Sequence, residues 1–423
     1  MRTFVRWFLG GAALCAAGPA VALSQETVIY NFQKGLDGAG PVGGLIADTA
    51  GALYGTTTYG NSNHGAVFKL TPPASGKTIW TETTLHTFDG SSGGAPHGRL
   101  LFGANGVIYG TTDSGGRKGA GVVFKLTPPA KGKTAWTYAV LYQFTGKSDG
   151  GAPRAGLISD DSGALYGTTS AGGIIVNGSS GNGTVFKLTP PASTPGVWTE
   201  TVLYRFTGGK DGGFPRGAVT PDVSVLYGTT ASGGNANGNG VVFKLTPATG
   251  GKTWKQTVLY TFTGGKDGGA PDPGVIRDAA NGTLYGTTYF GGGTTNGSGV
   301  VYSLTPPKSA TGTWKETTLY AFRGLADGGH PYEGQLILKG GFLYGTTQGS
   351  QESGLGNGGT VFELIPPKAG STTWTEHVLY DFKNGLDGGG PDSGVLVGKS
   401  GEFYGTANTG GTKVNGVVYK LVP

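Results

Sequence analysis

The stretch that decides the fold is Leu53-Tyr54-Gly55-Thr56-Thr57, because close copies of it recur along the whole chain. Its tyrosine returns at Tyr109, Tyr166, Tyr227, Tyr285, Tyr344 and Tyr404. The intervals between successive tyrosines are 55, 57, 61, 58, 59 and 60 residues. Self-similarity at a nearly constant spacing of this length is typical of solenoids and propellers. The seven copies leave no room for a separate domain of another kind.

Each repeat holds four short runs of β-branched and aromatic residues between clusters of Gly and Pro, the pattern typical of strands. The first run follows a proline (44–48), the second is the pentapeptide, the third is 65–70, and the fourth begins at a tryptophan (198–206). Short Gly-rich connections between such runs predict an antiparallel meander. An apolar period of 3.6 residues is absent after residue 24, so we expect almost no helix.

Seven units of four strands predict an all-β fold, a seven-bladed β-propeller with four antiparallel strands per blade. Residues 26–32 read as a fourth strand with no earlier partners, and residues 416–421 read as a third strand with no successor. We therefore expect the N-terminal strand to complete the last blade. Such pairing closes the ring, whereas an open array would expose an unpaired strand edge. The predicted propeller domain is 25–423.

The first 24 residues read as a secretory signal peptide, with Arg2 and Arg6 before an apolar stretch at 8–17 and small residues at 20–24. This predicts a secreted or periplasmic bacterial protein. The single cysteine, Cys15, lies in this segment, so the mature chain has no thiol. We expect no membrane span in the mature chain, and a monomer.

Composition excludes several classes of protein. With 86 Gly in 423 residues, the chain falls short of the one-third Gly of collagen, and 36% hydrophobic residues are too many for a disordered chain. The net charge of +6 becomes +4 without Arg2 and Arg6, and no basic run of the nucleic-acid-binding type occurs. We expect no nucleic-acid partner.

The repeat resembles a known family. The sequences Leu-Tyr-Gly-Thr-Thr, Val-Phe-Lys-Leu-Thr-Pro-Pro (67–73) and Trp-Thr-Glu-Thr-Val-Leu-Tyr (198–204) resemble the GloVer tandem repeat of secreted bacterial choice-of-anchor proteins, over residues 26–423. The resemblance implies an exported repeat protein and no particular reaction. At a coarser level, the Gly-Gly after the second strand and the Trp of the fourth resemble kelch-like β-propeller repeats. The copper-radical chemistry of some kelch proteins needs a Cys–Tyr crosslink, which a mature chain without cysteine excludes.

The repeat also separates scaffold residues from candidates for function. Aromatic residues that recur in most units are expected to form the core between blades. The recurrent Asp of the Asp-Gly-Gly loops is expected to support a turn. Calcium binding is the alternative for these loops, although no Asp-x-Asp-x-Asp spacing occurs. We predict no metal site and no cofactor. The aspartates concerned are Asp37, Asp149, Asp211, Asp267, Asp327 and Asp387.

Positions that differ from unit to unit are the better candidates. The residues after the loop proline are expected to ring the channel mouth, and they are Val42, His97, Arg154, Arg216, Asp272, Tyr332 and Asp392. Unrepeated aromatic residues gather in units four to six, beside polar groups. Aromatic faces beside polar groups favour stacking on sugars, and their alternative role is to pack on one another. The candidate ligand-binding residues are Phe214, Arg216, Asp272, Tyr289, Phe290, His330, Tyr332 and Glu333.

Three functions follow as hypotheses. The favoured one is non-catalytic recognition or scaffolding outside the cytoplasm, with a polysaccharide as ligand and no catalytic residue. The second is a polysaccharide lyase or glycosidase that uses Asp272, Glu333, His330 and Tyr332. The third is a platform that binds a cell-surface protein.

Overall fold

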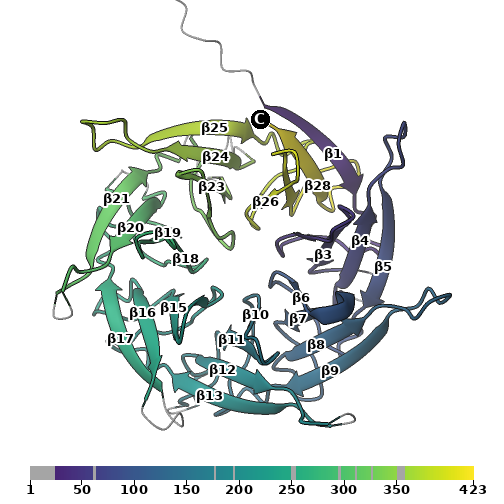
Figure 1. Cartoon of the computed structure of the whole chain (residues 1–423), viewed down its shortest axis with the longest axis horizontal. Coiled ribbons are helices and arrows are strands. Elements are labelled where there is room, and N and C mark those ends of the chain that lie inside the picture. The colour runs from purple at the N-terminus through teal and green to yellow at the C-terminus, as the bar shows by residue number, and fades with distance from the viewer. Residues whose placement is uncertain are drawn as a thin grey trace, which may run out of the picture.

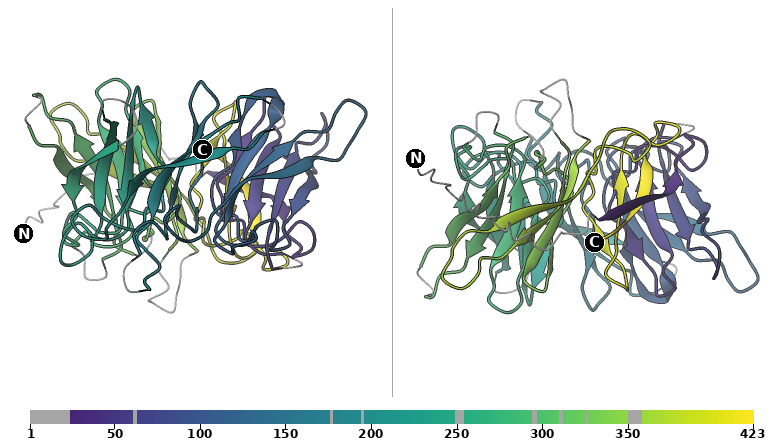
Figure 2. Two further views of the ribbon diagram at one scale, coloured as in Figure 1. Left: turned by 90° about the horizontal axis from the view of Figure 1, so that it is seen from below. Right: turned by 90° about the horizontal axis from the view of Figure 1, so that it is seen from above.

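The computed structural model describes residues 24–60, 63–175, 178–193, 196–248, 254–293, 297–309, 312–324, 327–349 and 358–423. These residues form seven antiparallel four-stranded sheets arranged in a ring (Figure 1). The blades stand side by side, with loops on both faces of a flat disc (Figure 2). This arrangement confirms the predicted seven-bladed β-propeller.

In six blades the strands run outward from the channel in chain order, and in blade 7 the N-terminal strand takes the outer place; the first strand is the shortest in each blade. Blade 1 contains β2 (Ile46–Ala47), β3 (Leu53–Thr57), β4 (Ala66–Thr71) and β5 (Thr81–Thr87). Blade 2 contains β6 (Leu101–Phe102), β7 (Ile108–Thr112), β8 (Val122–Thr127) and β9 (Thr137–Gln143). Blade 3 contains β10 (Ile158–Ser159), β11 (Leu165–Thr169), β12 (Thr184–Thr189) and β13 (Thr199–Arg205). Blade 4 contains β14 (Thr220–Asp222), β15 (Val225–Thr230), β16 (Val241–Pro247) and β17 (Trp254–Thr261).

The last three blades follow the same order. Blade 5 contains β18 (Val275–Arg277), β19 (Leu284–Thr288), β20 (Val300–Thr305) and β21 (Lys315–Ala321). Blade 6 contains β22 (Ile337–Lys339), β23 (Phe342–Thr347), β24 (Thr360–Ile365) and β25 (Thr375–Asp381). Blade 7 contains β26 (Leu396–Val397), β27 (Phe403–Ala407) and β28 (Val417–Val422), and its outer strand is β1 (Gln25–Asn31).

The two ends of the described chain meet in blade 7. Strand β1 pairs antiparallel with β28, from Gln25 opposite Val422 to Asn31 opposite Val417 (Figure 1). The predicted closure by the N-terminal strand is therefore confirmed. The predicted signal peptide (1–24) stays a prediction, because the described residues begin at Ser24.

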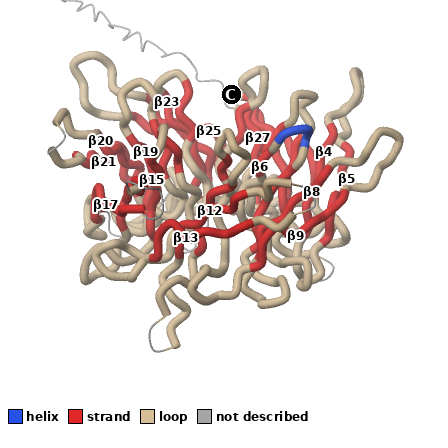
Figure 3. Tube along the Cα trace, turned by 60° about the horizontal axis from the view of Figure 1, so that its bottom comes forward, coloured by secondary structure: helices blue, strands red, loops and turns tan. Residues whose placement is uncertain are grey.

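Helix is nearly absent, as the sequence predicted. Over the part of the chain that the structure describes, the single helical element is the 3-10 turn η1 (Ala104–Gly106), drawn in blue in Figure 3. None of the described helices is long and apolar enough to cross a membrane.

Aromatic pairs hold neighbouring blades together. A Phe after the outer strand of one blade meets the ring of the third strand in the next, as Phe32 meets Phe68 with centroids 5.1 Å apart. Such edge-to-face pairs contribute about 0.5–1.5 kcal/mol each beyond the burial of their area. The recurrent aromatic residues thus form the core between blades, as predicted. The six other pairs are Phe88–Phe124, Phe144–Phe186, Phe206–Phe243, Phe262–Tyr302, Phe322–Phe362 and Phe382–Tyr419.

This packing explains the recurrent pentapeptide. A Cβ on Gly55 would lie 2.6 Å from the Phe68 ring, so only glycine leaves room for the aromatic core beneath it. The first threonine links adjacent blades: the Thr111 hydroxyl donates to the Ala155 carbonyl at 2.9 Å, and Thr168 donates to Gly217 at 3.1 Å. The glycine of the motif therefore serves the aromatic core, and in blades 2 and 3 the threonine serves a contact between blades.

Candidate functional site

One face of the disc is built from two kinds of loop. The loop that enters each blade pairs with the loop after that blade's second strand, as in the bridges Gly213–Ser232 and Gly269–Phe290. The residue before the loop proline is left-handed in all seven blades, with φ between 50° and 63°. These residues are Gly40, Ala95, Ala152, Phe214, Ala270, His330 and Gly390.

Two of these left-handed positions depart from the repeat. A non-glycine residue at positive φ costs roughly 1 kcal/mol or more, and five blades hold only Gly or Ala there. Blades 4 and 6 instead hold the large side chains of Phe214 and His330. Because the strained backbone is common to all blades, the unusual feature is the size of these two side chains on the mouth face.

A carboxylate of blade 6 reaches across the channel. Five positions separate Pro331 from the buried Leu336, whereas four separate the equivalent residues in every other blade, such as Pro153 and Leu157. Glu333 lies in this longer segment. Its carboxylate accepts from the Arg154 guanidinium of blade 3 at 3.2 Å, and lies 3.4 Å from His97 Nδ1 of blade 2.

Arg216 and Asp272 form a second ion pair, between blades 4 and 5. Arg216 Nη1 lies 3.4 Å from Asp272 Oδ2, while Asp272 is only 3% exposed. Burial raises the pKa of Asp272 to about 6, the charge of Glu333 adds to this, and Arg216 opposes it. The other oxygen, Asp272 Oδ1, is buried with no hydrogen-bond partner among the described residues. The mouth thus holds a carboxyl group that is protonated near neutral pH more readily than an ordinary aspartate.

A third buried carboxyl group belongs to blade 7. Asp392 is 4% exposed and accepts a hydrogen bond from the Asn408 side chain. Burial raises its pKa to about 8, with the charge of Glu333 as a further cause, while the bond from Asn408 opposes the rise. The charge of Glu333 therefore acts on both Asp272 and Asp392.

Three aromatic rings gather beside these charges. The Tyr289 ring lies edge-to-face on Tyr332 at 5.5 Å and tilted on His330 at 4.9 Å. His330 Nδ1 also lies 3.0 Å from the Tyr289 carbonyl oxygen. Tyr332 is half-buried, and burial raises the pKa of its phenol. The rings pack on one another, as one sequence hypothesis expected, and they form a single aromatic cluster of blades 5 and 6.

The remaining two candidates, Phe214 and Phe290, contact the loops of the same face. The Phe290 ring covers Gly269, where a Cβ would lie 2.4 Å from the ring. The Phe214 backbone bonds to Asn182 of the preceding blade and to Ala231 of its own, and its side chain is half-buried.

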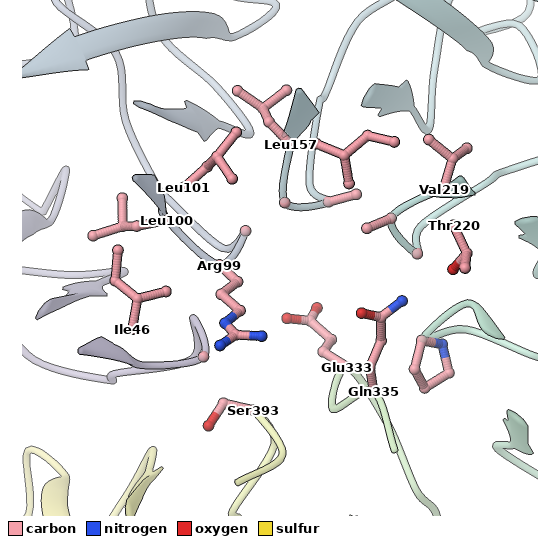
Figure 4. Close-up of a pocket in the computed structure, with 18 of the residues that line it drawn as sticks. Ile46, Arg99, Leu100, Leu101, Leu157, Val219, Thr220, Glu333, Gln335 and Ser393 are labelled. Atoms are coloured by element: carbon pink, nitrogen blue, oxygen red, sulfur yellow. The ribbon is translucent and has the colours of Figure 1, made fainter. Parts of the chain in front are cut away.

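The channel contains a cavity of about 540 Å³. Of the eight sequence candidates, Arg216 and Glu333 line it. Arg99, Glu333 and Gln335 point toward its centre, with Leu101, Leu157 and Val219 around the wall (Figure 4).

Several residues of this region were not among the sequence candidates. His97, Arg154 and Asp392 were predicted at the mouth, but the site was assigned to blades 4 to 6 alone. The sequence feature that could have identified these three residues as part of the site is their shared position directly after the loop proline. Arg99 also had a signal, because the residue before the first buried aliphatic side chain is Gly or Ala in five blades, and the exceptions are Arg99 and Gln335.

The Asp-Gly-Gly aspartates act on their own loops. In Asp211, for example, Oδ2 accepts from the Tyr204 hydroxyl at 3.0 Å and from the Thr207 N–H at 2.9 Å. This is the predicted turn chemistry. In the described ranges, no group of three or more His, Cys, Asp or Glu side chains is placed to hold a metal ion.

The fold and site define a class: a seven-bladed propeller whose blades differ mainly at one polar channel mouth. Residues 20–238 and 222–423 match the Gloeobacter/Verrucomicrobia repeat, and the chain belongs to that repeat family. This confirms the family read from the tandem repeats. The likeness to kelch repeats and the choice-of-anchor assignment stay predictions. None of the curated proteins matches the chain.

Solved structures share the fold at low identity. A candidate 6-phosphogluconolactonase of Bacteroides uniformis is 13% identical, with a TM-score of 0.50 over 84% of this chain and 88% of that one. A Trichoderma reesei carbohydrate-active enzyme of family AA12 is 12% identical, with a TM-score of 0.44 over 95% and 96%. An ulvan lyase of polysaccharide lyase family PL25 is 9% identical, with a TM-score of 0.43 over 91% and 93%. The likeness to the first of these structures indicates a common fold, and none of the three carries a function across.

Proposed function

We propose that the protein is an exported, non-catalytic recognition propeller that binds a polysaccharide at the channel mouth. The observation that carries this proposal is the aromatic cluster of Tyr289, His330 and Tyr332 beside the ion pairs of the mouth. Ring faces and edges offer apolar contact to sugar rings, while guanidinium and carboxylate groups exchange hydrogen bonds with hydroxyl groups. Ligand sites commonly combine apolar and aromatic side chains with a few polar groups that fix the orientation of the ligand.

One observation favours catalysis as a second candidate. Asp272 has a pKa raised to about 6, and the charged Glu333 contributes to that rise. Two carboxyl groups in unlike environments are what a glycosidase uses as acid and base. Here both carboxylates are held by arginines, Asp272 by Arg216 and Glu333 by Arg154, which supports a structural and binding role for them.

The test uses residues 25–423 and a panel of neutral and acidic polysaccharides, with retention in affinity electrophoresis and release of reducing or unsaturated ends both measured. We expect retention without products. Replacing Tyr289 and Tyr332 by Ala should weaken retention about tenfold or more, since each ring contact contributes about 1 kcal/mol. Tyr59→Ala is the matched control, because Tyr59 occupies the equivalent loop of blade 1 and is 54% exposed.

Other outcomes would replace the proposal. Product release that Asp272→Asn abolishes would establish the enzyme hypothesis. Neither retention nor products would contradict both hypotheses about polysaccharides and leave protein binding as the function to test.

A further inference from the structure

The most unusual cation of the molecule lies inside the channel. Arg99 comes from blade 2, and its Nε donates to the Leu45 carbonyl of blade 1 at 3.1 Å, with the aliphatic part of the side chain over Gly44. Its two terminal nitrogens have no hydrogen-bond acceptor and no ion pair among the residues that the structure describes. The side chain keeps accessible surface, and that surface faces the cavity (Figure 4).

The Arg99 side chain is exposed to the channel, with protein atoms around the rest of it. Partial burial by these atoms lowers the pKa of Arg99, although an arginine starts so high that it keeps its charge. Arg99 therefore presents an open pair of donors in the geometry that suits a carboxylate.

The balance of charge around the cavity favours an anion. Arg154 and Arg216 line the same cavity, while Glu333 is the single carboxylate in its lining. Glu333 is already engaged with Arg154 and His97. At the far end, Arg277 has its own counter-ion, Asp222, at 3.1 Å. Arg99 is thus the lining arginine left without an acidic partner in the described chain.

Part of the cavity wall is apolar. Leu101, Ile276 and Ile337 line the cavity and keep accessible surface, while Leu157 and Val219 are buried in the core between blades. A volume of about 540 Å³ lies within the range of sites that enclose small molecules. An anion that is charged throughout would leave these walls in contact with water, whereas an anion with an apolar body would cover them.

We infer that the channel is a binding site for a small monocarboxylate with an apolar chain or ring. The carboxylate accepts two hydrogen bonds from the terminal nitrogens of Arg99, and the apolar body lies against the aliphatic wall. This site is separate from the aromatic cluster at the mouth, so it does not rest on polysaccharide binding.

The test is isothermal titration of residues 25–423 with octanoate, with 1-octanol, octylammonium and acetate as comparison ligands. We expect octanoate to bind one to one, and each of the other three to bind at least tenfold more weakly. Octanol and octylammonium keep the chain without the negative charge, and acetate keeps the charge without the chain.

Two variants test the two parts of the site, the guanidinium that binds the carboxylate and the space that holds the apolar body. Arg99→Gln should weaken octanoate binding at least tenfold and leave polysaccharide retention unchanged. Ala218→Leu should also weaken it, because Ala218 lines the cavity at the position equivalent to Arg99 and the larger side chain takes up space. Arg117→Gln, at an exposed loop arginine, is the control and should have no effect. Thermal unfolding verifies that each variant is folded, and Arg99→Lys keeps the charge should Arg99→Gln fail to fold.

Three results would overturn the inference. The first is no heat of octanoate binding to the folded protein at millimolar concentration. The second is equal binding of octanoate and octanol, or undiminished binding by Arg99→Gln, either of which removes the role of the guanidinium. The third is equal binding of acetate and octanoate, which removes the role of the walls.

Discussion

The outer parts of the contacts between neighbouring blades, here called seams, and the channel mouth both contain aromatic and charged residues. At the seams these residues repeat from blade to blade, whereas at the mouth they vary. At six seams, a tyrosine of one blade donates to the aspartate seven residues later, as Tyr260 donates to Asp267 at 2.9 Å. At the mouth, the seven residues after the loop prolines share neither charge nor size. The comparison teaches that the contacts between blades are repeated almost unchanged around the ring, while the residues of the mouth differ from blade to blade. The other five pairs are Tyr30–Asp37, Tyr142–Asp149, Tyr204–Asp211, Tyr320–Asp327 and Tyr380–Asp387.

In the described chain, the seam between blades 1 and 2 lacks the Tyr–Asp hydrogen bond that the six other seams have, and its residues show which positions depend on one another. Here His86 replaces the tyrosine, Gly93 replaces the aspartate, and Tyr138 replaces the glutamate that the next blade usually supplies. His86 stacks on Tyr138 with centroids 3.8 Å apart and planes 3° apart. The three positions differ together, so a tyrosine, an aspartate and a glutamate or glutamine form one unit at the other seams.

The largest expected effect comes from opening the ring. Deleting residues 25–31 removes β1 and leaves the edge of β28 unpaired. It also removes polar groups from two seams, because Tyr30 donates to Asp37 and Glu26 lies near the charge of Asp387. We expect loss of cooperative unfolding in calorimetry and a fall in the melting temperature of more than 10 °C, on the scale of several lost contacts.

A matched truncation gives the control for this prediction. The chain that begins at residue 25 should melt as the longer chain does, if the leader takes no part in the ring. An unchanged melting temperature after deletion of 25–31 would contradict closure by β1 as the basis of stability.

The second prediction concerns the seam glutamates and pH. Burial raises the pKa of Glu26, Glu200 and Glu376 to about 7, and the charge of a seam aspartate adds to each rise. The folded state then binds protons more tightly than the unfolded chain. Stability from this source is complete below pH 4.5 and is lost as the pH rises through 7.

We therefore expect a higher melting temperature at pH 5.5 than at pH 8, by about 3–6 °C after allowance for solvent screening. His86 acts in the opposite direction, since burial lowers its pKa to about 4, but it is a single group. The triple variant Glu26→Gln, Glu200→Gln, Glu376→Gln should reduce the difference. Gln256 already occupies this position in blade 4, where its Nε2 donates to the Asp211 carbonyl at 3.2 Å. A melting temperature that rises from pH 5.5 to pH 8 would show that these carboxyl groups are not the controlling ones.

The features that could be predicted from the sequence are mainly those that repeat from blade to blade, and the features that could not are mainly those of the mouth and channel. The fold and its closure depend on repeated contacts, so the pentapeptide and the unmatched strands at 26–32 and 416–421 were sufficient. The pair Arg216–Asp272 and the rings Tyr289 and Tyr332 were also within reach, because adjacent blades are one repeat apart in the sequence.

The rest of the site depends on distances across the ring, which the repeat does not encode. Glu333 meets Arg154, 179 residues away, because one additional residue in blade 6 lets a long side chain cross the channel. The raised pKa of Asp272 depends on burial, which no single position in the sequence reveals. Arg99 differs from the Gly or Ala that five of the other six blades hold at this position, but its role depends on a cavity that exists only once the ring has closed.

The smallest expected effect tests whether the mouth acts as one electrostatic unit, unlike the seams, which act separately. Glu333→Gln keeps a hydrogen-bond acceptor for Arg154 and removes the charge. Burial is the main cause of the raised pKa of Asp272 and Asp392, and the charge of Glu333 is a lesser one. Both pKa values should therefore fall by about half a pH unit and stay above that of an ordinary aspartate. Carboxyl carbon NMR titration measures this, with Glu82→Gln at a seam as the control that should leave both groups unchanged. If Glu333→Gln also leaves the pKa values of Asp272 and Asp392 unchanged, the carboxyl groups of the mouth titrate independently of Glu333. The residues that vary between blades would then act one by one and not as a single electrostatic unit.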